Sequence, residues 1–156
     1  FNMIRPGLTL YGIYPDPNLK DTAHFEPVLS LKSRIILVKK IRAGESVGYG
    51  REFIATRDTR IAVLPFGYSQ GYPYAAWEKA SVLFKGKKHR LAGKVSMDYM
   101  TINLGTTEAQ EGDLVTLLGE DQDEHITAED IAEWAGTIPY EVVTRLNIHL
   151  PRIVIQ

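Results

Sequence analysis

The chain has 156 residues, 44% of them hydrophobic and 24% charged, with a formal net charge of −1. This length suits one folded domain with a core of its own, and the charge balance argues against an electrostatic nucleic-acid-binding protein. The absence of cysteine excludes disulfides, thiolate zinc sites and a cysteine nucleophile.

The first 24 residues differ from the rest. The segment "FNMIRPGLTLYGIYP" begins abruptly in apolar sequence without an initiator methionine, and "PDPNLKD" has the turn-forming residues of an exposed connector. We therefore expect residues 1–24 to be the end of an upstream unit plus a linker, and residues 25–156 to form a second domain. No signal peptide and no apolar run of roughly 18 residues is present, so we expect a soluble, cytoplasmic protein.

Most of the second domain has the pattern of short β-strands. "PVLSLKSRIILVKKI" predicts one long strand with Ile35, Leu37 and Ile41 on one side and basic residues on the other. "SVLFKGKKHRLAG" predicts a hairpin, and "PRIVIQ" a closing strand. Further apolar segments between turn signals are "RIAVLPF", "YMTINL" and "DLVTLLG". This spacing predicts a mainly β fold, either a small β-barrel-like domain or a sandwich.

One or two short helices follow the strands. In "ITAEDIAEWAG", Thr127 is placed to cap a helix, with Asp130 three residues later as in a capping box and Gly136 as the stop. "IPYEVVTRL" predicts a second helix, with Pro139 in its first turn.

Several kinds of site find little support in the residues. The four histidines are scattered without paired spacing, so we predict no metal site; they are His24, His89, His125 and His149. The basic run "KGKKHR" could contact phosphate but is more typical of a solvated turn. The glycines of "GYG" could cradle a phosphate, yet no helix-forming stretch follows them. The serines lack a nearby histidine for a nucleophilic triad.

Tyrosine offers a more open question. Tyr49, Tyr68 and Tyr140 lie in turns marked by glycine or proline, in "ESVGYGREF", "PFGYSQGYP" and "IPYEV". Each could simply pack as an aromatic, or present its phenol to a ligand. A phenol has a pKa of about 10 and serves as a general base only where cations stabilise the phenolate. Asp98 in "VSMDYM" could bond to local backbone, or could hold a turn whose amides face a ligand.

Six motifs in order carry a family resemblance: "IRPGLTLYGIYP", "GESVGYGREF", "IAVLPFGYSQGYP", "LAGKVSMDYMTINL", "EGDLVTLLG" and "IPYEVVTRL" with "PRIVIQ". Together they closely resemble the C-terminal part of alanine racemase, a family of pyridoxal-phosphate (PLP) enzymes of fold type III. The resemblance implies a (β/α)8 barrel followed by a mainly β domain, and a head-to-tail homodimer with composite active sites. Residues 1 to about 15 match the end of the barrel.

The resemblance also implies roles for individual residues. Arg5 matches the arginine that bonds the pyridine nitrogen of PLP, and Gly7 and Leu8 match backbone contacts to its phosphate. Tyr140 matches a phenol that binds the same phosphate. Tyr49 matches the catalytic tyrosine, the base that exchanges the α-proton of L-alanine in the site of the partner subunit.

Three further positions match residues around the substrate. Met97 and Asp98 match residues that approach its carboxylate, and Tyr68 matches the narrow entrance. Lys94 departs from the family, because many relatives have arginine there, and "SQGYPYAAWE" replaces a more acidic, arginine-bearing segment.

The resemblance implies L-alanine and D-alanine interconversion by two bases, for peptidoglycan synthesis. The second base, the PLP-binding lysine, belongs to the barrel, so we expect this chain alone to be inactive and to hold PLP poorly. Alternatives are a racemase of serine or another amino acid, and a non-catalytic β-barrel interaction module.

Overall fold

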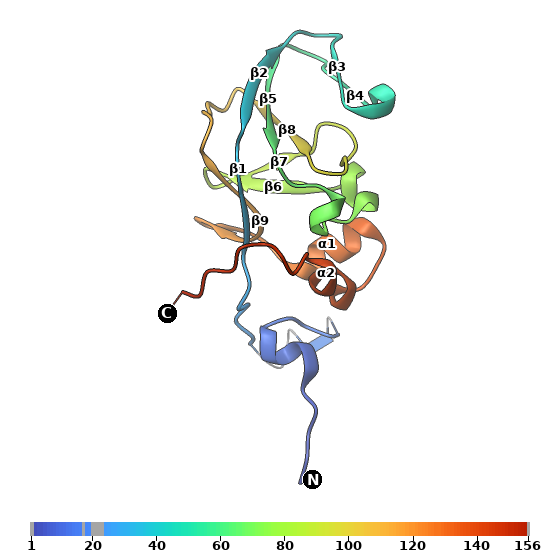
Figure 1. Ribbon diagram of the computed structural model, residues 1–156, viewed down its shortest axis with the longest axis vertical. Coiled ribbons are helices and arrows are strands. Elements are labelled where there is room, and N and C mark those ends of the chain that lie inside the picture. Colours follow the sequence, from blue (N-terminus) through green and yellow to red (C-terminus); the bar gives the residue numbers. More distant parts are fainter. Residues whose placement is uncertain (1, 17, 20–23, 156) are drawn as a thin grey trace.

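The computed structural model describes residues 2–16, 18–19 and 24–155, and its body is mainly β with two α-helices at one side (Figure 1). The strands are β1 Leu31–Arg34, β2 Leu37–Ile41, β3 Ser46–Val47, β4 Phe53–Ile54, β5 Thr59–Leu64, β6 Ser81–Phe84, β7 Lys87–Arg90, β8 Met100–Gly105, β9 Leu114–Asp121 and β10 Glu124–Ile126. The helices are α1 Ala128–Ala135 and α2 Pro139–Arg145, with 3-10 turns η1 Gly7–Tyr11, η3 Tyr49–Arg51, η4 Tyr68–Gln70 and η5 Tyr74–Glu78.

All strand pairs described are antiparallel and fall into three sheets. One has the order β1-β9-β6-β7 with β10 paired to β9, the second has the order β2-β5-β8, and β3 pairs with β4. A single bridge between Leu91 and Ile102 links the first two sheets. The mainly β prediction with two helices is confirmed, while the described strands do not close into a continuous barrel.

The main core draws buried side chains from strands of the two larger sheets and from both helices. Burial alternates along β8, where Met100, Ile102 and Leu104 are buried, because successive side chains of a strand face opposite sides. All four residues of β6 are buried, since this strand lies inside its sheet. Each large aliphatic side chain buried this way stabilises the fold by about 1.5–3 kcal/mol.

The long strand predicted over residues 27–41 is wrong, because residues 27–30 lie outside any strand and the chain changes sheets between β1 and β2. The N–H of Ile35 donates to Asp113 O, beside β9, whereas the N–H of Ile36 donates to Val63 O in β5. The burial pattern of the residues in β1 therefore does not continue into β2. Ile35 is therefore buried as expected, but Leu37 is 46% exposed.

The closing strand predicted for "PRIVIQ" is also wrong for residues 151–155, which have no regular secondary structure; Gln156 lies outside the described residues. Figure 1 shows this segment leading away from the body, without a neighbouring strand to bond its backbone. The hairpin over "SVLFKGKKHRLAG" is confirmed as β6 and β7.

Both helices form where local signals placed them. Thr127 accepts from the N–H of Asp130 at 3.1 Å and donates its own N–H to Asp130 Oδ2 at 2.8 Å, so the predicted capping box is confirmed. Gly136 ends α1 with a φ of 67°, and α2 begins at Pro139. Within the described part of the chain, no helix combines the length and apolar character needed to span a membrane.

Candidate functional site

Tyr49 begins the short turn η3 between β3 and β4, and its side chain is 74% exposed. Gly48 and Gly50 on either side have φ angles of 76° and 74°, a left-handed conformation that favours glycine. These glycines let the chain turn sharply twice and leave the phenol projecting. Arg51 is the charged residue nearest in sequence, and its Nε donates to Ser46 Oγ at 3.1 Å.

The turn of Tyr49 contacts the segment after β7. Lys94 Nζ donates to Glu52 Oε1 at 2.7 Å. This hydrogen bond, followed by the charge of the same carboxylate, raises the pKa of Lys94 above its ordinary value despite some desolvation. Lys94 is therefore a cation at neutral pH, and it pairs with Glu52 beside the turn.

Tyr68, Met97 and Asp98 are brought together by the fold. The N–H of Tyr68 donates to Ser96 O at 3.1 Å, and the N–H of Ser69 donates to Met97 O at 2.9 Å. Gly67 permits this approach, because a Cβ at that position would lie 2.3 Å from Ser96 O and 2.4 Å from Met97 O. The turn η4 thus lies directly on the segment of Met97 and Asp98.

The carboxylate of Asp98 is fixed by residues of η4. Asp98 Oδ1 accepts from Ser69 Oγ at 2.6 Å and from Gln70 Nε2 at 3.4 Å. Asn147 also binds the backbone of η4: its N–H donates to Gln70 O at 3.1 Å and its side-chain Nδ2 donates to Ser69 O at 3.2 Å. Sequence reasoning did not single out Ser69, Gln70 or Asn147, because only long-range contacts distinguish them from other polar turn residues.

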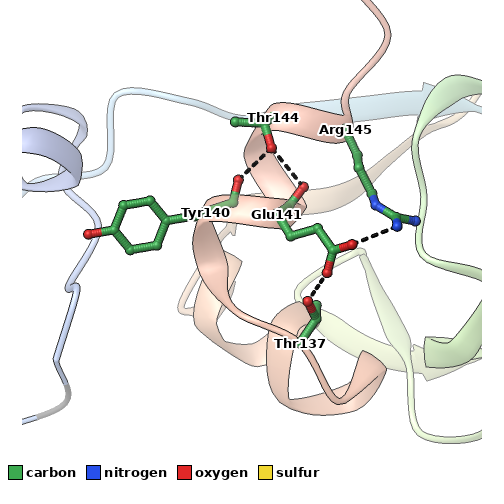
Figure 2. Close-up of polar contacts among 5 residues, drawn as sticks. All are labelled: Thr137, Tyr140, Glu141, Thr144 and Arg145. Atoms are coloured by element: carbon green, nitrogen blue, oxygen red, sulfur yellow. Dashed lines mark hydrogen bonds and ion pairs between the residues drawn. The ribbon is translucent and has the colours of Figure 1, made fainter.

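Tyr140 lies in the first turn of α2, on the side away from the ionic contacts of that helix (Figure 2). Glu141 Oε1 pairs with Arg145 at 2.6 Å, and Thr137 donates to the other oxygen of Glu141. Thr144 Oγ1 donates to Tyr140 O at 2.8 Å. These contacts brace the helix and leave the exposed phenol of Tyr140 free to meet a ligand.

An open pocket of about 450 Å³ lies between η4 and the end of α2, lined by Tyr68, Gly71, Tyr72, Tyr74 and Arg145. The rings of Tyr68 and Tyr74 meet edge to face with centroids 6.3 Å apart. Tyr72 is only 2% exposed, and burial raises the pKa of its phenol far above the usual range. Tyr72 therefore stays protonated, and its side chain packs in the core.

Arg5, Gly7 and Leu8 lie in the N-terminal segment, at the opposite end of the molecule from η3 (Figure 1). Arg5 is exposed, Gly7 has a φ of 58° and Leu8 is buried. The N–H of Tyr14 donates to Glu129 Oε1 at 2.9 Å, which ties the segment to α1. One copy of the chain therefore does not bring Tyr49 to these three residues.

The family model of the alanine racemase C-terminal domain matches residues 28–154. The chain belongs to this family. Alanine racemase from Carboxydothermus hydrogenoformans is 39% identical over 98% of the chain, and that from Vibrio vulnificus is 43% identical over 92%. Among solved structures, alanine racemase from Streptomyces lavendulae aligns over 96% of the chain at 37% identity with a TM-score of 0.91.

The chain spans only about two fifths of these relatives: 42% of the Carboxydothermus protein, 40% of the Vibrio protein and 40% of the Streptomyces structure. A structure of the Bacillus anthracis alanine racemase with bound L-Ala-P aligns at 32% identity with a TM-score of 0.90, and the chain covers 39% of it. The family therefore accounts for the β fold of this chain, and the remainder of such proteins lies outside it.

The described residues offer no cluster of three or more histidine or acidic side chains able to hold a metal ion. The exposed polar groups among the predicted site residues are the phenols of Tyr49, Tyr68 and Tyr140, the Asp98 carboxylate and the Arg5 guanidinium, which one copy of the chain does not bring together in a single site. This set can donate hydrogen bonds to an anionic ligand and exchange a proton through a phenol.

Proposed function

We propose that this chain is the C-terminal part of a PLP-dependent alanine racemase, a cytoplasmic isomerase that interconverts L-alanine and D-alanine for cell-wall peptidoglycan. Membership of the alanine racemase C-terminal domain family supports the proposal. In the proposed enzyme, residues 1–24 would be the end of the barrel and a linker, and residues 25–156 would be the β domain.

The separation of Tyr49 from the N-terminal segment is the observation that carries the proposal. A base acts only within hydrogen-bond reach of the proton it removes. Tyr49 projects from one end of the molecule while Arg5, Gly7 and Leu8 lie at the other (Figure 1). A homodimer, in which Tyr49 of each copy enters the site of the other, would resolve this separation and would explain the exposure of the phenol.

The donors of the chain fit a phosphorylated pyridine. PLP, when bound, supplies an electron sink that acidifies the α-proton of an amino acid. Arg5 would hold the ring nitrogen, since a guanidinium donates hydrogen bonds and does not give up its proton. The N–H groups of Gly7 and Leu8 begin η1 and have no acceptor within that turn, so they could donate to the phosphate of PLP. The exposed phenol of Tyr140 could donate to the same phosphate.

Tyr49 Oη would take the proton from Cα of L-alanine and would return one in the reverse direction. Asp98 has its Oδ1 engaged by Ser69 and Gln70, so it would hold the turn while the backbone near Met97 approaches the substrate carboxylate. Tyr68, paired edge to face with Tyr74, would narrow the entrance.

Racemisation by the full-length protein tests this function. L-alanine and L-serine are supplied separately, and the D-enantiomer is quantified after chiral derivatisation. We expect D-alanine to form at a much higher kcat/KM than D-serine. Faster turnover of serine would favour a serine racemase, and no turnover of any amino acid in the presence of PLP would favour a non-catalytic module. The 156-residue chain alone should give no product.

A further inference from the structure

The turn that carries Tyr49 has little backbone support of its own. Its flanking strands β3 and β4 have two residues each, and in the described part of the chain they form a sheet of their own, continued by two backbone hydrogen bonds of Ala55 with Gly44 and Glu45. A two-stranded ladder this short is marginally stable in water. The residues of η3 itself are all exposed. Side-chain contacts to the rest of the domain must therefore decide how firmly the phenol is held.

One such contact reaches the domain core. Glu52 follows η3 directly, and its Oε1 accepts from Lys94 Nζ at 2.7 Å. The same ammonium lies over the ring of Trp77, 5.7 Å from the centroid, and Trp77 packs against the main core. A cation at that distance is attracted by the ring. Lys94 thus connects the turn to a side chain that packs against the core.

The pair also lies against the backbone next to the phenol. A Cβ on Gly50 would lie 3.1 Å from Glu52 Oε1 and 3.4 Å from Lys94 Nζ. One residue before Lys94, a Cβ on Gly93 would lie 2.9 Å from Val47 O. Both glycines therefore allow close packing, and the ion pair fills the space beside the residue that follows Tyr49.

From these contacts we infer that Lys94 and Glu52 are positioning residues for Tyr49, holding its turn so that the phenol is presented in one orientation. The inference rests on the proposed function of Tyr49 as a base. A misplacement of about 1 Å can cost a reaction up to about 100-fold in rate. A weak ion pair that fixes this turn can therefore have a large effect on kcat. The neighbouring Arg51–Ser46 contact is more local, because both residues belong to the same hairpin.

Hydrogen exchange in the 156-residue chain tests the tie without any activity. Lys94→Met removes the charge, Lys94→Arg keeps it, and Lys88→Met is the control, since it removes a lysine–glutamate ion pair with Glu124 that is somewhat more exposed and lies elsewhere. We expect Lys94→Met to speed amide exchange in residues 46–54 about threefold, the scale of an exposed ion pair. Lys94→Arg and Lys88→Met should leave these amides unchanged. Equal exchange in all three variants would overturn the inference.

Kinetics of the full-length protein supply the second arm. Lys94→Met should lower kcat about tenfold with KM within about twofold, because placement of the base and not substrate binding is changed. Lys94→Arg should restore kcat. Equal losses in Lys94→Met and Lys94→Arg would contradict a positioning role. If Tyr49→Phe keeps full activity, the proposed function of Tyr49 as a base is wrong. The hydrogen-exchange result would still show whether the Lys94–Glu52 ion pair holds the turn.

Discussion

The hydroxyl of Ser69 donates a hydrogen bond of 2.6 Å to Asp98 Oδ1, across 29 positions of sequence. This contact joins the turn of Tyr68 to the segment of Met97 and Asp98. It therefore couples the proposed entrance to the proposed carboxylate site, and it gives the exposed Asp98 a fixed orientation.

This coupling predicts a non-additive pair of mutations. Ser69→Ala and Asp98→Ala each remove the same hydrogen bond, so the double variant should lose less stability than the sum of the two. We expect a coupling energy of about 1 kcal/mol for a bond to an exposed charged group. Urea unfolding of the four chains measures it. Additive losses would mean that the contact contributes nothing to the fold.

Gly67 should be intolerant of a side chain for steric reasons. Its φ of −145° is open to any residue, but a Cβ would lie 2.3 Å from Ser96 O. We expect Gly67→Ala to lower the free energy of unfolding by about 2–4 kcal/mol, as overpacking against backbone does. Gly105→Ala is the comparison, since its Cβ would enter open space and only its φ of 61° is unfavourable. That variant should lose about 1–2 kcal/mol. A smaller loss at Gly67 than at Gly105 would refute the close contact.

The phenol of Tyr72 should be dispensable. Among the described residues its buried hydroxyl has no hydrogen-bond partner. Removing an unsatisfied buried polar group is neutral or stabilising by about 1 kcal/mol, so Tyr72→Phe should unfold at an equal or higher urea concentration. Tyr14→Phe provides the contrast, because Tyr14 Oη accepts from the N–H of Phe25 at 3.1 Å. That variant should be less stable, and a destabilised Tyr72→Phe chain would indicate a partner for its hydroxyl.

The capping box of α1 should contribute measurably. Thr127→Ala removes the acceptor of the Asp130 N–H and should cost about 1 kcal/mol of unfolding free energy. Thr106→Ala is an exposed control and should change stability by less than about 0.5 kcal/mol. Thermal unfolding followed by circular dichroism distinguishes the two, and equal midpoints would contradict the role of the cap.

Local signals explain which parts of the fold were predictable. Thr127, Asp130 and Gly136 define α1 through residues within one turn of each end, so the sequence alone was sufficient. The switch at Ile35 and Ile36 was not predictable, because it depends on acceptors at Asp113 and Val63. An apolar run looks the same whether it pairs with one sheet or with two.

The candidate site divides in a similar way. The order of the motifs pointed to Tyr49, Tyr68 and Asp98 through a family resemblance. The residues that contact them could be identified only from the folded chain. Lys94 was visible as a departure from the family, but its contact with Glu52 joins positions 42 residues apart and has no sequence signature. The roles assigned to all of the site residues stay predictions: Arg5, Gly7, Leu8, Tyr49, Tyr68, Met97, Asp98 and Tyr140.

Tyr49 is proposed to act as a base of an alanine racemase. The most direct measurement is kcat for L-alanine racemisation by the full-length protein carrying Tyr49→Phe, with the unfolding midpoint as a control for folding. Loss of a positioned base costs about 100- to 10,000-fold, so we predict a fall in kcat of at least about 100-fold at an unchanged midpoint. A kcat within about twofold of the unmodified protein would mean that Tyr49 is not a base in this reaction.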